Sequence, residues 1–502
     1  MIVPVNDRER ATKFVQQAGA RGRGTSMKTN GIMALVPRIA LVFGLWSAAT
    51  ADDHLGASVG PNPWKQHRGT VDLLLRASQP HEFDVRDFGA AGDAKTDDTR
   101  AFQSAFDACI ASGGGTVVVP PGDYFMAGTV TVNTTTPAPP HSLRGMGWSS
   151  NLLWAADADL IVWANPPKIT VAELAISSII GKKSVNSTAL RVGVGSGVGA
   201  QRCEFDHLLF FGAGRVANTT YVATPIGTAL DLGEVSDTTT IRDSVIWFVR
   251  GKGVVVGRGS EIRIEGGRII GSVDCATGEH KLPPNATVDE IISSGSIGIH
   301  VTGNNGGVHV LSTDVIAHAI GMLLEDATGA GSNREIFITH ATFDSDYVGL
   351  LVRDNSYISI AGCWAASSDI AQIWLAPTAH GAQLTVAAGT IFNGGAYQKD
   401  ATPGSCTIAG GCNGLVADAG TFLLTGLLIR NNKGAGVIVR SPTVSHYSIT
   451  GCQFFGNGVA LDLIGNEFAV TGNVLHDNSR PNRVKADESS IITNNVGWKV
   501  DT

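Results

Sequence analysis

Three charged residues in the middle of the chain have the types and spacing that chemistry on a sugar requires. Asp206, Arg242 and Glu265 occupy one position of a repeated apolar segment, where later repeats carry Thr or Ala. If the repeats stack as neighbouring strands, the two carboxylates lie about 9–10 Å apart. That separation is near the upper end of the distances between the two carboxyl groups of inverting glycosidases, which must fit a water molecule between the acid and the base.

Other polar residues near these three offer a different chemistry. His207 and Asp243 lie one residue further along their repeats, and Lys252 follows shortly after in the sequence. A polysaccharide lyase needs a base that takes the proton next to a uronate carboxyl group, together with a cation that neutralises the carboxyl. His207 with Arg242 meets these needs, and so does Lys252. The sequence therefore leaves hydrolysis and elimination open.

The segment 242–268 carries more basic than acidic side chains, which favours an acidic glycan as the substrate. An Arg side chain binds a carboxylate through two parallel hydrogen bonds. A surface ion-pair ladder is the alternative interpretation, and such a ladder would stabilise the fold little. The sequence thus predicts four catalytic and four substrate-binding candidates: Asp206, His207, Asp243 and Glu265, and Arg242, Lys252, Arg263 and Arg268.

No motif in the sequence points to a cofactor. Nucleotide and haem motifs are absent, and no Cys or His pair has the spacing of zinc ligands. We therefore expect no required cofactor and no metal centre. Calcium is the open alternative, with Asp206, Asp243 and Glu265 as its ligands, although their spacing does not demand an ion.

A second carboxylate pair, Asp344 and Asp346, also has the residue types of a catalytic pair. Asp346, however, aligns with Asn432, Asn457 and Asn478 of later repeats. Short polar side chains are typical of such a turn position, where they satisfy the backbone of the bend. The alignment therefore predicts a structural role for Asp346 and leaves Asp344 as a minor catalytic candidate.

These assignments depend on a repeat that runs through most of the chain. Segments with an apolar-x-apolar-Thr-Gly core recur, and from residue 340 onward their centres are 22, 26, 38, 25, 21 and 22 residues apart. A period in the low twenties, with short strands and no helices, is typical of a parallel solenoid, here of about thirteen coils. The twelve centres are Glu173, His207, Asp243, Gly266, Ser312, His340, Gly362, Ala388, Gly426, Gly451, Gly472 and Asn494.

The segment before the repeats, residues 83–132, predicts a helix followed by a strand. Apolar residues, Phe106 among them, recur on one face of the helix. Asp93, Asp97 and Asp98 precede it and resemble a metal cluster. We expect them instead to shape the loop and to cap the helix, which closes the end of the solenoid.

This segment also carries a family resemblance. The run DFGAAGDAKTDDTRAFQSAFDAC, followed by GGGTVVVPPGDY, resembles the N-terminal signature of the pectate-lyase superfamily, which includes polygalacturonases, rhamnogalacturonases, mannuronan epimerases and phage tailspikes. The resemblance implies an all-β fold, a right-handed parallel β-helix (solenoid) with an N-terminal capping helix. It transfers no catalytic residue, because neither the motif set of the polygalacturonases nor the Asp-Pro-His-Glu motif of the epimerases stands in this chain.

The composition limits the classes of partner. The 502 residues are 43% hydrophobic and 16% charged, which excludes a globally disordered chain and a coiled coil. Of the 37 basic and 44 acidic residues, the first 51 positions hold seven and two, which leaves 30 basic and 42 acidic side chains. A body this acidic is a poor binder of nucleic acids or anionic membranes.

The N-terminus predicts export. Residues 27–51 combine two basic residues, an apolar run and a small-x-small cleavage site, which is a signal-peptide pattern too short to span a membrane. We expect a signal peptide within 1–51, either with an upstream extension or with Met27 as the true start. A linker or arm over 52–81 and a β-helix domain over 82–500 then follow.

The cysteines fit an exported protein. Seven Cys are present, so at least one has no partner within the chain. In an oxidising compartment, Cys406 and Cys412 are placed to close the Gly-rich loop between them.

Together these features predict a secreted enzyme, a glycoside hydrolase or polysaccharide lyase, that acts on an acidic, uronate-containing glycan in a groove on the side of the β-helix. The alternative is a non-catalytic glycan-binding or adhesive β-helix similar to a tailspike, which the missing catalytic motifs favour. We expect a polysaccharide as the partner, no nucleic acid, no membrane span, and either a monomer or a homotrimer.

Overall fold

The structure is a computed structural model that describes most of the chain after residue 80. The described ranges are 81–133, 139–164, 168–179, 187–194, 202–216, 220–223, 226–233, 238–271, 282, 286–303, 306–326, 334–396 and 411–500. The expected signal peptide, nearly all of the expected arm and the loop cysteine Cys406 lie outside these ranges. Among the described helices, none has the length and apolar character that crossing a bilayer requires.

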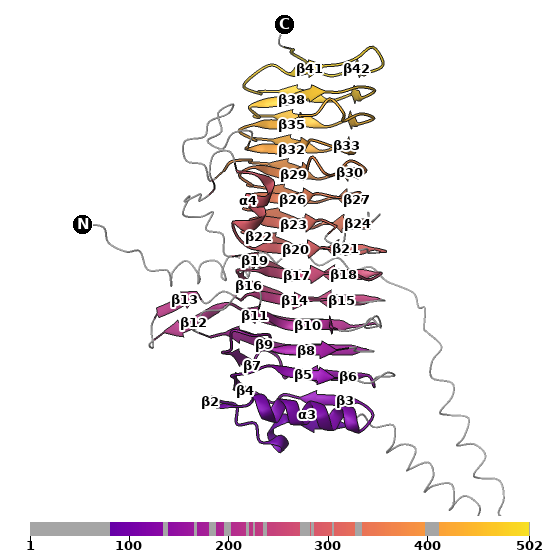
Figure 1. Ribbon diagram of the computed structural model, residues 1–502. Coiled ribbons are helices and arrows are strands. Elements are labelled where there is room, and N and C mark those ends of the chain that lie inside the picture. Colours follow the sequence, from indigo (N-terminus) through magenta and orange to yellow (C-terminus); the bar gives the residue numbers. More distant parts are fainter. Residues whose placement is uncertain are drawn as a thin grey trace, which may run out of the picture. The chain divides into compact units, whose positions relative to one another are not determined.

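The described strands form two parallel sheets that wind together into a β-helix (Figure 1). A typical coil contributes one strand to a 13-stranded sheet, sheet B, and two strands to a 27-stranded sheet, sheet A. The coils stack from helix α3 (Thr99–Ala111) at one end to strands β41 (Arg483–Lys485) and β42 (Ile491–Thr493) at the other. The predicted parallel β-helix is therefore confirmed.

Each coil adds its two sheet A strands to two stacks, which we call the first and the second column of sheet A. Sheet B and both columns follow the chain order of the coils, and β9 and β11 are long enough to belong to both columns. Sheet B holds β5 (Val130–Asn133), β8 (Ile161–Ala164), β10 (Thr188–Val194), β14 (Thr228–Asp231), β17 (Lys252–Val256), β20 (Ile297–Val301), β23 (Ile320–Leu324), β26 (Val348–Val352), β29 (Ala371–Leu375), β32 (Asn413–Ala417), β35 (Ala435–Val439), β38 (Val459–Ile464) and β41. The first column of sheet A holds β1 (Glu82–Asp84), β3 (Gly115–Val118), β6 (His141–Arg144), β9 (Ile169–Ser178), β11 (Glu204–Phe211), β15 (Thr239–Arg242), β18 (Ile262–Glu265), β21 (Val308–Leu311), β24 (Arg334–Thr339), β27 (Ser356–Ala361), β30 (Gln383–Ala387), β33 (Thr421–Thr425), β36 (Ser448–Thr450), β39 (Ala469–Thr471) and β42. The second column holds β2 (Asp93–Asp97), β4 (Gly122–Met126), β7 (Ser150–Trp154), β9, β11, β16 (Val245–Val249), β19 (Arg268–Gly271), β22 (Asp314–Ile316), β25 (Thr342–Asp344), β28 (Trp364–Ala366), β31 (Thr390–Phe392), β34 (Leu428–Arg430), β37 (Gln453–Phe455) and β40 (Val474–His476).

Two short elements stand outside this pattern. The strands β12 (Ala213–Val216) and β13 (Thr220–Ala223) form an antiparallel hairpin after β11. The short 3-10 helix η1 (Val85–Phe88) follows β1. Neither element interrupts the stacking of the coils.

The amphipathic helix α3 covers the first coil and buries its apolar face there. Asp98 stands at the N-cap, but its side chain does not cap the helix, so the expectation that it does so is wrong. Its carboxylate instead accepts hydrogen bonds from the amides of residues 91 and 92. The carboxylate of Asp97 accepts from the amide of Thr99 at 3.1 Å. The acids at this end therefore shape the loop and the helix start, and both roles are structural.

All twelve repeat centres have left-handed backbone geometry. Their φ angles lie between 45° and 67°, and each centre turns the chain from the first column of sheet A toward the second. Gly adopts this conformation freely, whereas other residues pay about 1 kcal/mol or more for it. Residues with a side chain at this position, such as His207 and Asp243, therefore carry a cost that Gly426 and Gly451 avoid.

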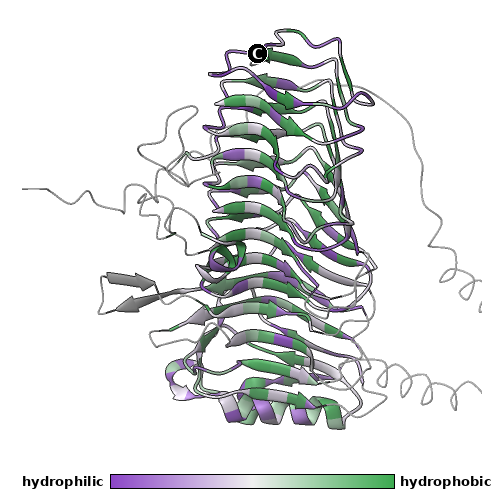
Figure 2. Ribbon diagram, turned by 45° about the horizontal axis from the view of Figure 1, so that its top comes forward, coloured by the Kyte–Doolittle hydropathy of each residue, from purple (hydrophilic) through white to green (hydrophobic). Residues whose placement is uncertain are grey.

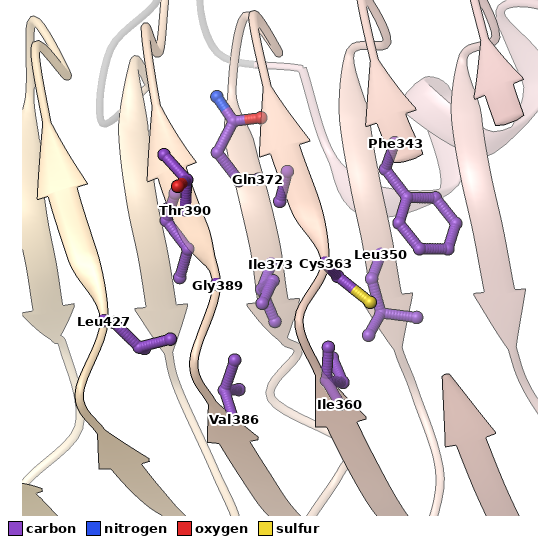
Figure 3. Close-up of a pocket in the computed structure, with 12 residues that line it drawn as sticks. Phe343, Leu350, Ile360, Cys363, Gln372, Ile373, Val386, Gly389, Thr390 and Leu427 are labelled. Carbon is purple, nitrogen blue, oxygen red and sulfur yellow. The ribbon is translucent and has the colours of Figure 1, made fainter. Parts of the chain in front are cut away.

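The interior of the coils is an apolar core. One continuous cluster of buried side chains runs from Val85 to Leu475, and Figure 2 shows hydrophobic colour along the strands of successive coils. Near Phe343, Leu350 and Cys363 the core leaves a small apolar cavity of about 10 Å³ (Figure 3). That volume holds no more than about one water molecule. The cavity is too small for a substrate.

A column of polar turn residues lies inside the coils after the second column of sheet A. The backbone amide of Asn432 donates to Asn457 Oδ1 at 3.1 Å, and that of Asn457 donates to Asn478 Oδ1 at 3.0 Å. Asn457 Nδ2 donates in turn to the carbonyl of Ile429. This hydrogen-bonded ladder satisfies backbone groups that the turn would otherwise bury without partners.

Asp346 occupies the same column, as the alignment predicted. Its Oδ1 accepts from the amide of His318 at 2.7 Å, whereas its fully buried Oδ2 has no hydrogen-bond partner among the described residues. Burial raises the pKa of Asp346 well above its ordinary value. Asp346 is therefore a structural residue, and at neutral pH its carboxylate is poorly matched to its site.

Helix α4 (Val288–Ser293) lies among the repeats, for which the sequence predicted short strands and no helices, so that expectation is wrong for these residues. Thr287 and Glu290 form a capping box at its start. Ile291 belongs to a second apolar cluster together with Leu323 and Leu351 of sheet B. α4 thus covers part of the outer face of sheet B.

We predict that Asp346→Asn stabilises the protein at neutral pH. The folded pKa of Asp346 is raised, so the stability it contributes is present at acid pH and is lost as the pH rises through that pKa. An Asn side chain carries no charge and adds a donor for a carbonyl, as Asn457 does. The free energy of unfolding should match that of the wild type near pH 4 and exceed it by about 1–3 kcal/mol near pH 7.

Denaturant unfolding at a series of pH values measures this difference. Asp344→Asn, two residues away and partly exposed, is the matched control and should show a much smaller pH-dependent gain. Parallel pH profiles for the wild type and Asp346→Asn would contradict the assignment.

Candidate functional site

The strand register places the three predicted ladder residues side by side. Asp206 pairs with Arg242 across β11 and β15, and Arg242 pairs with Glu265 across β15 and β18. Arg242 Nη1 lies 4.0 Å from Asp206 Oδ1, and its Nε lies 3.8 Å from Glu265 Oε2. The Arg242 side chain is 49% exposed. These three residues, the sheet A ladder, therefore form a loose and solvated set of charge contacts on the outer face of sheet A.

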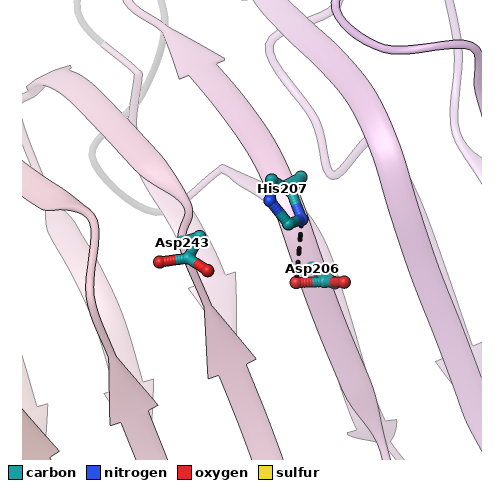
Figure 4. A group of neighbouring side chains, drawn as sticks. All are labelled: Asp206, His207 and Asp243. Atoms are coloured by element: carbon teal, nitrogen blue, oxygen red, sulfur yellow. Dashed lines mark ion pairs between the residues drawn. The ribbon is translucent and has the colours of Figure 1, made fainter. Parts of the chain in front are cut away.

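His207 and Asp243 lie beside the sheet A ladder at two successive left-handed positions (Figure 4). His207 Nδ1 is 3.0 Å from Asp206 Oδ1 and 4.0 Å from Glu173 Oε1. Trp148 Nε1 donates a hydrogen bond to the backbone carbonyl of His207 at 3.3 Å. The structure thus brings together five of the eight predicted site residues: Asp206, His207, Arg242, Asp243 and Glu265.

Within this group, ligand atoms of Asp206, His207 and Asp243 all lie within 4.8 Å of one another. A histidine nitrogen suits a transition metal better than calcium, which prefers oxygen ligands. Proximity alone does not require an ion, because exposed carboxylates meet in this way without one. The expectation of no required metal stays a prediction, and no step of the mechanism below uses a metal.

The basic side chains of segment 242–268 do not form a basic patch in space. Arg268 Nη2 binds Asp314 Oδ2 at 2.9 Å, and Arg263 Nη2 lies 3.7 Å from Glu261 Oε2. Asp314 belongs to the next coil and is distant from Arg268 in the sequence, so a short stretch of sequence around Arg268 does not reveal this partner. These residues form exposed ion pairs, which contribute about 0–1 kcal/mol each.

Lys252 lies apart from the other seven predicted residues. It begins β17 in sheet B and pairs in register with Ile297 of β20, whereas the sheet A ladder belongs to the other sheet. The grouping of Lys252 with Arg242 is therefore wrong in space, although the two residues are close in sequence. Lys252 has a different set of neighbours.

An ion-pair network surrounds Lys252 on the outer face of sheet B. On one side, Arg191 Nε lies 2.7 Å from Asp159 Oδ2, and Arg191 Nη1 lies 2.6 Å from Asp231 Oδ2. The register aligns Arg191 of β10 with Asp231 of β14. This half of the network holds Asp231 within electrostatic reach of Lys252.

The other half of the network lies toward α4. His300 Nε2 is 2.8 Å from Glu325 Oε1, and Arg353 Nη1 is 3.1 Å from Glu325 Oε2. Arg353 Nη2 also pairs with Asp289 Oδ1 of α4 at 3.0 Å. The sheet B network thus consists of Asp159, Arg191, Asp231, Lys252, His300, Glu325 and Arg353, with Asp289 at its margin.

Lys252 has an unusual position in the sheet B network. No ion pair within 4.0 Å joins it to another described residue, although the carboxylates of Asp231 and Glu325 act on its ammonium group. Burial lowers the pKa of Lys252, and these two carboxylates oppose that shift. A partly buried amine of lowered pKa is a suitable general base, because more of it is neutral near physiological pH.

The pKa values of the titratable groups around Lys252 are also shifted. Burial lowers the pKa of His300, and its hydrogen bond to Glu325 opposes the shift. The same hydrogen bond lowers the pKa of Glu325, whereas burial raises the pKa of Asp231. Perturbed groups gather at functional sites, which favours the sheet B network.

The sequence reasoning missed His300, Glu325 and Arg353. His300 pairs in register with Val255 of β17, so an alignment of the sheet B strands would have shown it as a polar residue in an outward position. Glu325 and Arg353 directly follow the buried strands β23 and β26. The alignment used the sheet A repeat and therefore did not compare these positions.

The N-terminal segment matches a family model. The model described as "Rhamnogalacturonase A/epimerase, pectate lyase-like" aligns with residues 83–137. The chain carries a pectate-lyase-like signature. Alginate lyase 7 of Azotobacter vinelandii is 57% identical over 47 residues, which is 9% of this chain and 6% of that protein. Mannuronan C5-epimerase AlgE3 of the same organism is 55% identical over 47 residues, 9% of this chain and 3% of that protein.

Solved structures are similar to this chain over a longer stretch. The A-module of the A. vinelandii mannuronan C-5 epimerase AlgE4 is 14% identical with a TM-score of 0.47, and the match covers 84% of this chain and 100% of that one. Tailspike protein 3 of bacteriophage CBA120 is 13% identical with a TM-score of 0.48, covering 89% of this chain and 70% of that one.

We predict that Lys252 titrates below the ordinary lysine value of about 10.4. Competitive labelling with acetic anhydride across a pH series, read by mass spectrometry, measures its pKa directly. Because Glu325 raises the pKa of Lys252, Glu325→Gln should lower the labelling midpoint further. The exposed Lys95, read in the same sample, controls for the reagent. A midpoint at the ordinary value, or a rise in Glu325→Gln, would remove Lys252 as a candidate base.

Proposed function

We propose that this protein is a secreted polysaccharide-active enzyme that acts on a uronate-containing glycan at the sheet B network. The observation that carries the proposal is Lys252, a partly buried amine of lowered pKa with no direct ion pair among the described residues. Its surroundings combine a positioned carboxylate–histidine pair with two guanidinium groups, those of Arg191 and Arg353. This set suits proton abstraction next to a carboxyl group.

The proposed reaction follows from these groups. Neutral Lys252 takes the proton from the sugar carbon that bears the carboxylate. Arg191 and Arg353 bind the sugar carboxylates by exchanging part of their pairing with Asp231 and Glu325. The electron pair of the broken C–H bond then forms a C=C bond and expels the glycosidic oxygen, which takes a proton from water, while the proton from carbon stays on Lys252 until solvent removes it. Return of a proton to the opposite face, without bond cleavage, gives the epimer instead.

The similarity to known enzymes supports this class. The matched relatives are named an alginate lyase and mannuronan epimerases, and both names refer to uronate polymers. The shared segment is short and contains no member of the sheet B network. It therefore supports the glycan class, and the chemistry rests on the site itself.

A hydrolase is the second candidate. The register places Asp206 and Glu265 two coils apart on either side of Arg242, about 9–10 Å by strand spacing. That arrangement would use Asp206 and Glu265 as acid and base with a water molecule between them. Hydrolysis would release saturated ends, whereas elimination releases unsaturated ones.

Turnover on a panel of polygalacturonate, rhamnogalacturonan and alginate tests the proposal. We predict that the wild type produces both reducing ends and unsaturated-uronate absorbance, or epimerised product by NMR, with a rate that rises as Lys252 becomes neutral. Lys252→Met should lower kcat by about 10²-fold or more with little change in Tm. Lys95→Met is the matched control and should keep full turnover.

Three results would count against this assignment. Reducing ends without unsaturated products would favour the hydrolase, and Asp206→Asn and Glu265→Gln would then abolish turnover. Unchanged turnover in Lys252→Met would remove Lys252 as the base. No product on any uronate glycan, together with glycan binding, would favour the non-catalytic β-helix.

Secretion is proposed on two grounds. The signal-peptide pattern ends before Asp52, and Cys412 is disulfide-bonded, which suits an oxidising compartment. We predict that N-terminal sequencing of the exported protein gives a mature end at Asp52. Retention of the whole chain inside the cell would contradict this.

A further inference from the structure

We propose that the sheet A ladder, together with Trp148, His207 and Asp243, is a second glycan-binding site that takes neutral sugar residues. This site is separate from the sheet B network, because its residues come from sheet A and from the turn between β6 and β7. It binds without chemistry. The proposal therefore stands or falls on binding, whatever reaction sheet B performs.

Trp148 is the first argument. Its side chain is 51% exposed, whereas Trp154 and Trp163 are fully buried in the core. The hydrogen bond from its Nε1 to the carbonyl of His207 holds the indole against the neighbouring coils. A large aromatic ring that is fixed in place yet left in water offers its face to an apolar partner. The C–H face of a sugar ring is such a partner, and its hydroxyl groups then point toward the rim.

Hydrogen-bonding groups at the rim are the second argument. Arg242 approaches Asp206 only to 4.0 Å and Glu265 only to 3.8 Å, so its N–H groups and the Glu265 carboxylate remain available to a ligand, whereas Asp206 Oδ1 is buried beside His207. Asp243 lies next to His207, with a ligand atom within 4.8 Å of the His207 and Asp206 ligand atoms (Figure 4). Vicinal sugar hydroxyls donate to carboxylates and accept from a guanidinium group. The site thus pairs an apolar platform with convergent polar groups, as small-ligand sites do.

Local charge selects the kind of glycan. Four carboxylates, those of Glu173, Asp206, Asp243 and Glu265, surround the single guanidinium of Arg242. A uronate placed among them meets net repulsion, which salt reduces but does not reverse at these distances. A neutral sugar meets no such penalty. We therefore assign neutral hexose or pentose residues to this site.

The side chains at the repeat centres add a third argument. The repeat centre that Asp243 occupies in its coil is Gly266 in the next coil and Gly426 in a later one. The fold therefore does not require a side chain at this position. Asp243→Gly therefore removes the carboxylate and suits the left-handed backbone. This gives a variant that should remain folded and still test the site.

Isothermal titration of the full chain with cello-, xylo-, galacto- and malto-oligosaccharides, in EDTA and physiological salt, tests the proposal. At least one neutral series should bind. Trp148→Ala and Asp243→Gly should each weaken that binding about tenfold or more. Trp247→Ala is the matched control: this exposed Trp lies on the same sheet but packs against Phe211 and Phe248, and its loss should leave binding unchanged. Thermal unfolding confirms that each variant is folded.

Each contrary result overturns the proposal. No neutral oligosaccharide binding in EDTA would do so, as would unchanged affinity in Trp148→Ala. Equal displacement of the neutral ligand by oligomannuronate would also overturn it, because the charge argument requires exclusion of uronates. None of these measurements needs turnover. A failure here is therefore distinct from a failure of the proposed enzymatic function.

Discussion

The hydrogen bonds that join each coil to the next determine where every other feature of this protein lies. A parallel strand pairs in register with the strand one coil away, so a residue type that recurs at one point of each coil forms a column along the β-helix. Interior columns must be apolar, and turn columns carry Asn or a left-handed residue. The outward columns of the two sheets and the turns that join them can hold charge in contact with solvent. Both proposed sites lie in those columns and turns.

The two charged surfaces differ in how far water screens them. On sheet A, Arg242 meets Asp206 and Glu265 only loosely and about half in solvent, which favours reversible contact with a ligand. On sheet B, burial shifts the pKa values of Lys252 and His300, and no described partner neutralises Lys252 directly. Keeping such an amine partly buried costs stability. The proposed role of Lys252 as a base connects this cost to the proposed chemistry.

The sequence predicted the fold and the sheet A register well, because both depend on a short repeat with one apolar pattern. All twelve repeat centres are left-handed, and Asp346 lies in the Asn column as its alignment indicated. The sequence failed where contacts join different coils or sheets. Arg268 finds Asp314, and Lys252 finds Asp231 and Glu325, through stacking that a sequence window does not contain. Helix α4 was missed because its stabilising contacts come from the outer face of sheet B.

The central claim is that the reacting sugar binds at sheet B. A crystal structure of the Lys252→Met variant with an oligouronate tests it most directly, because this variant removes the proposed base and should trap the substrate. The account predicts a sugar carbon next to its carboxyl group facing the position of the Lys252 amine, with sugar carboxylates near Arg191 or Arg353. An oligouronate bound instead along Asp206, Arg242 and Glu265 on sheet A would contradict it.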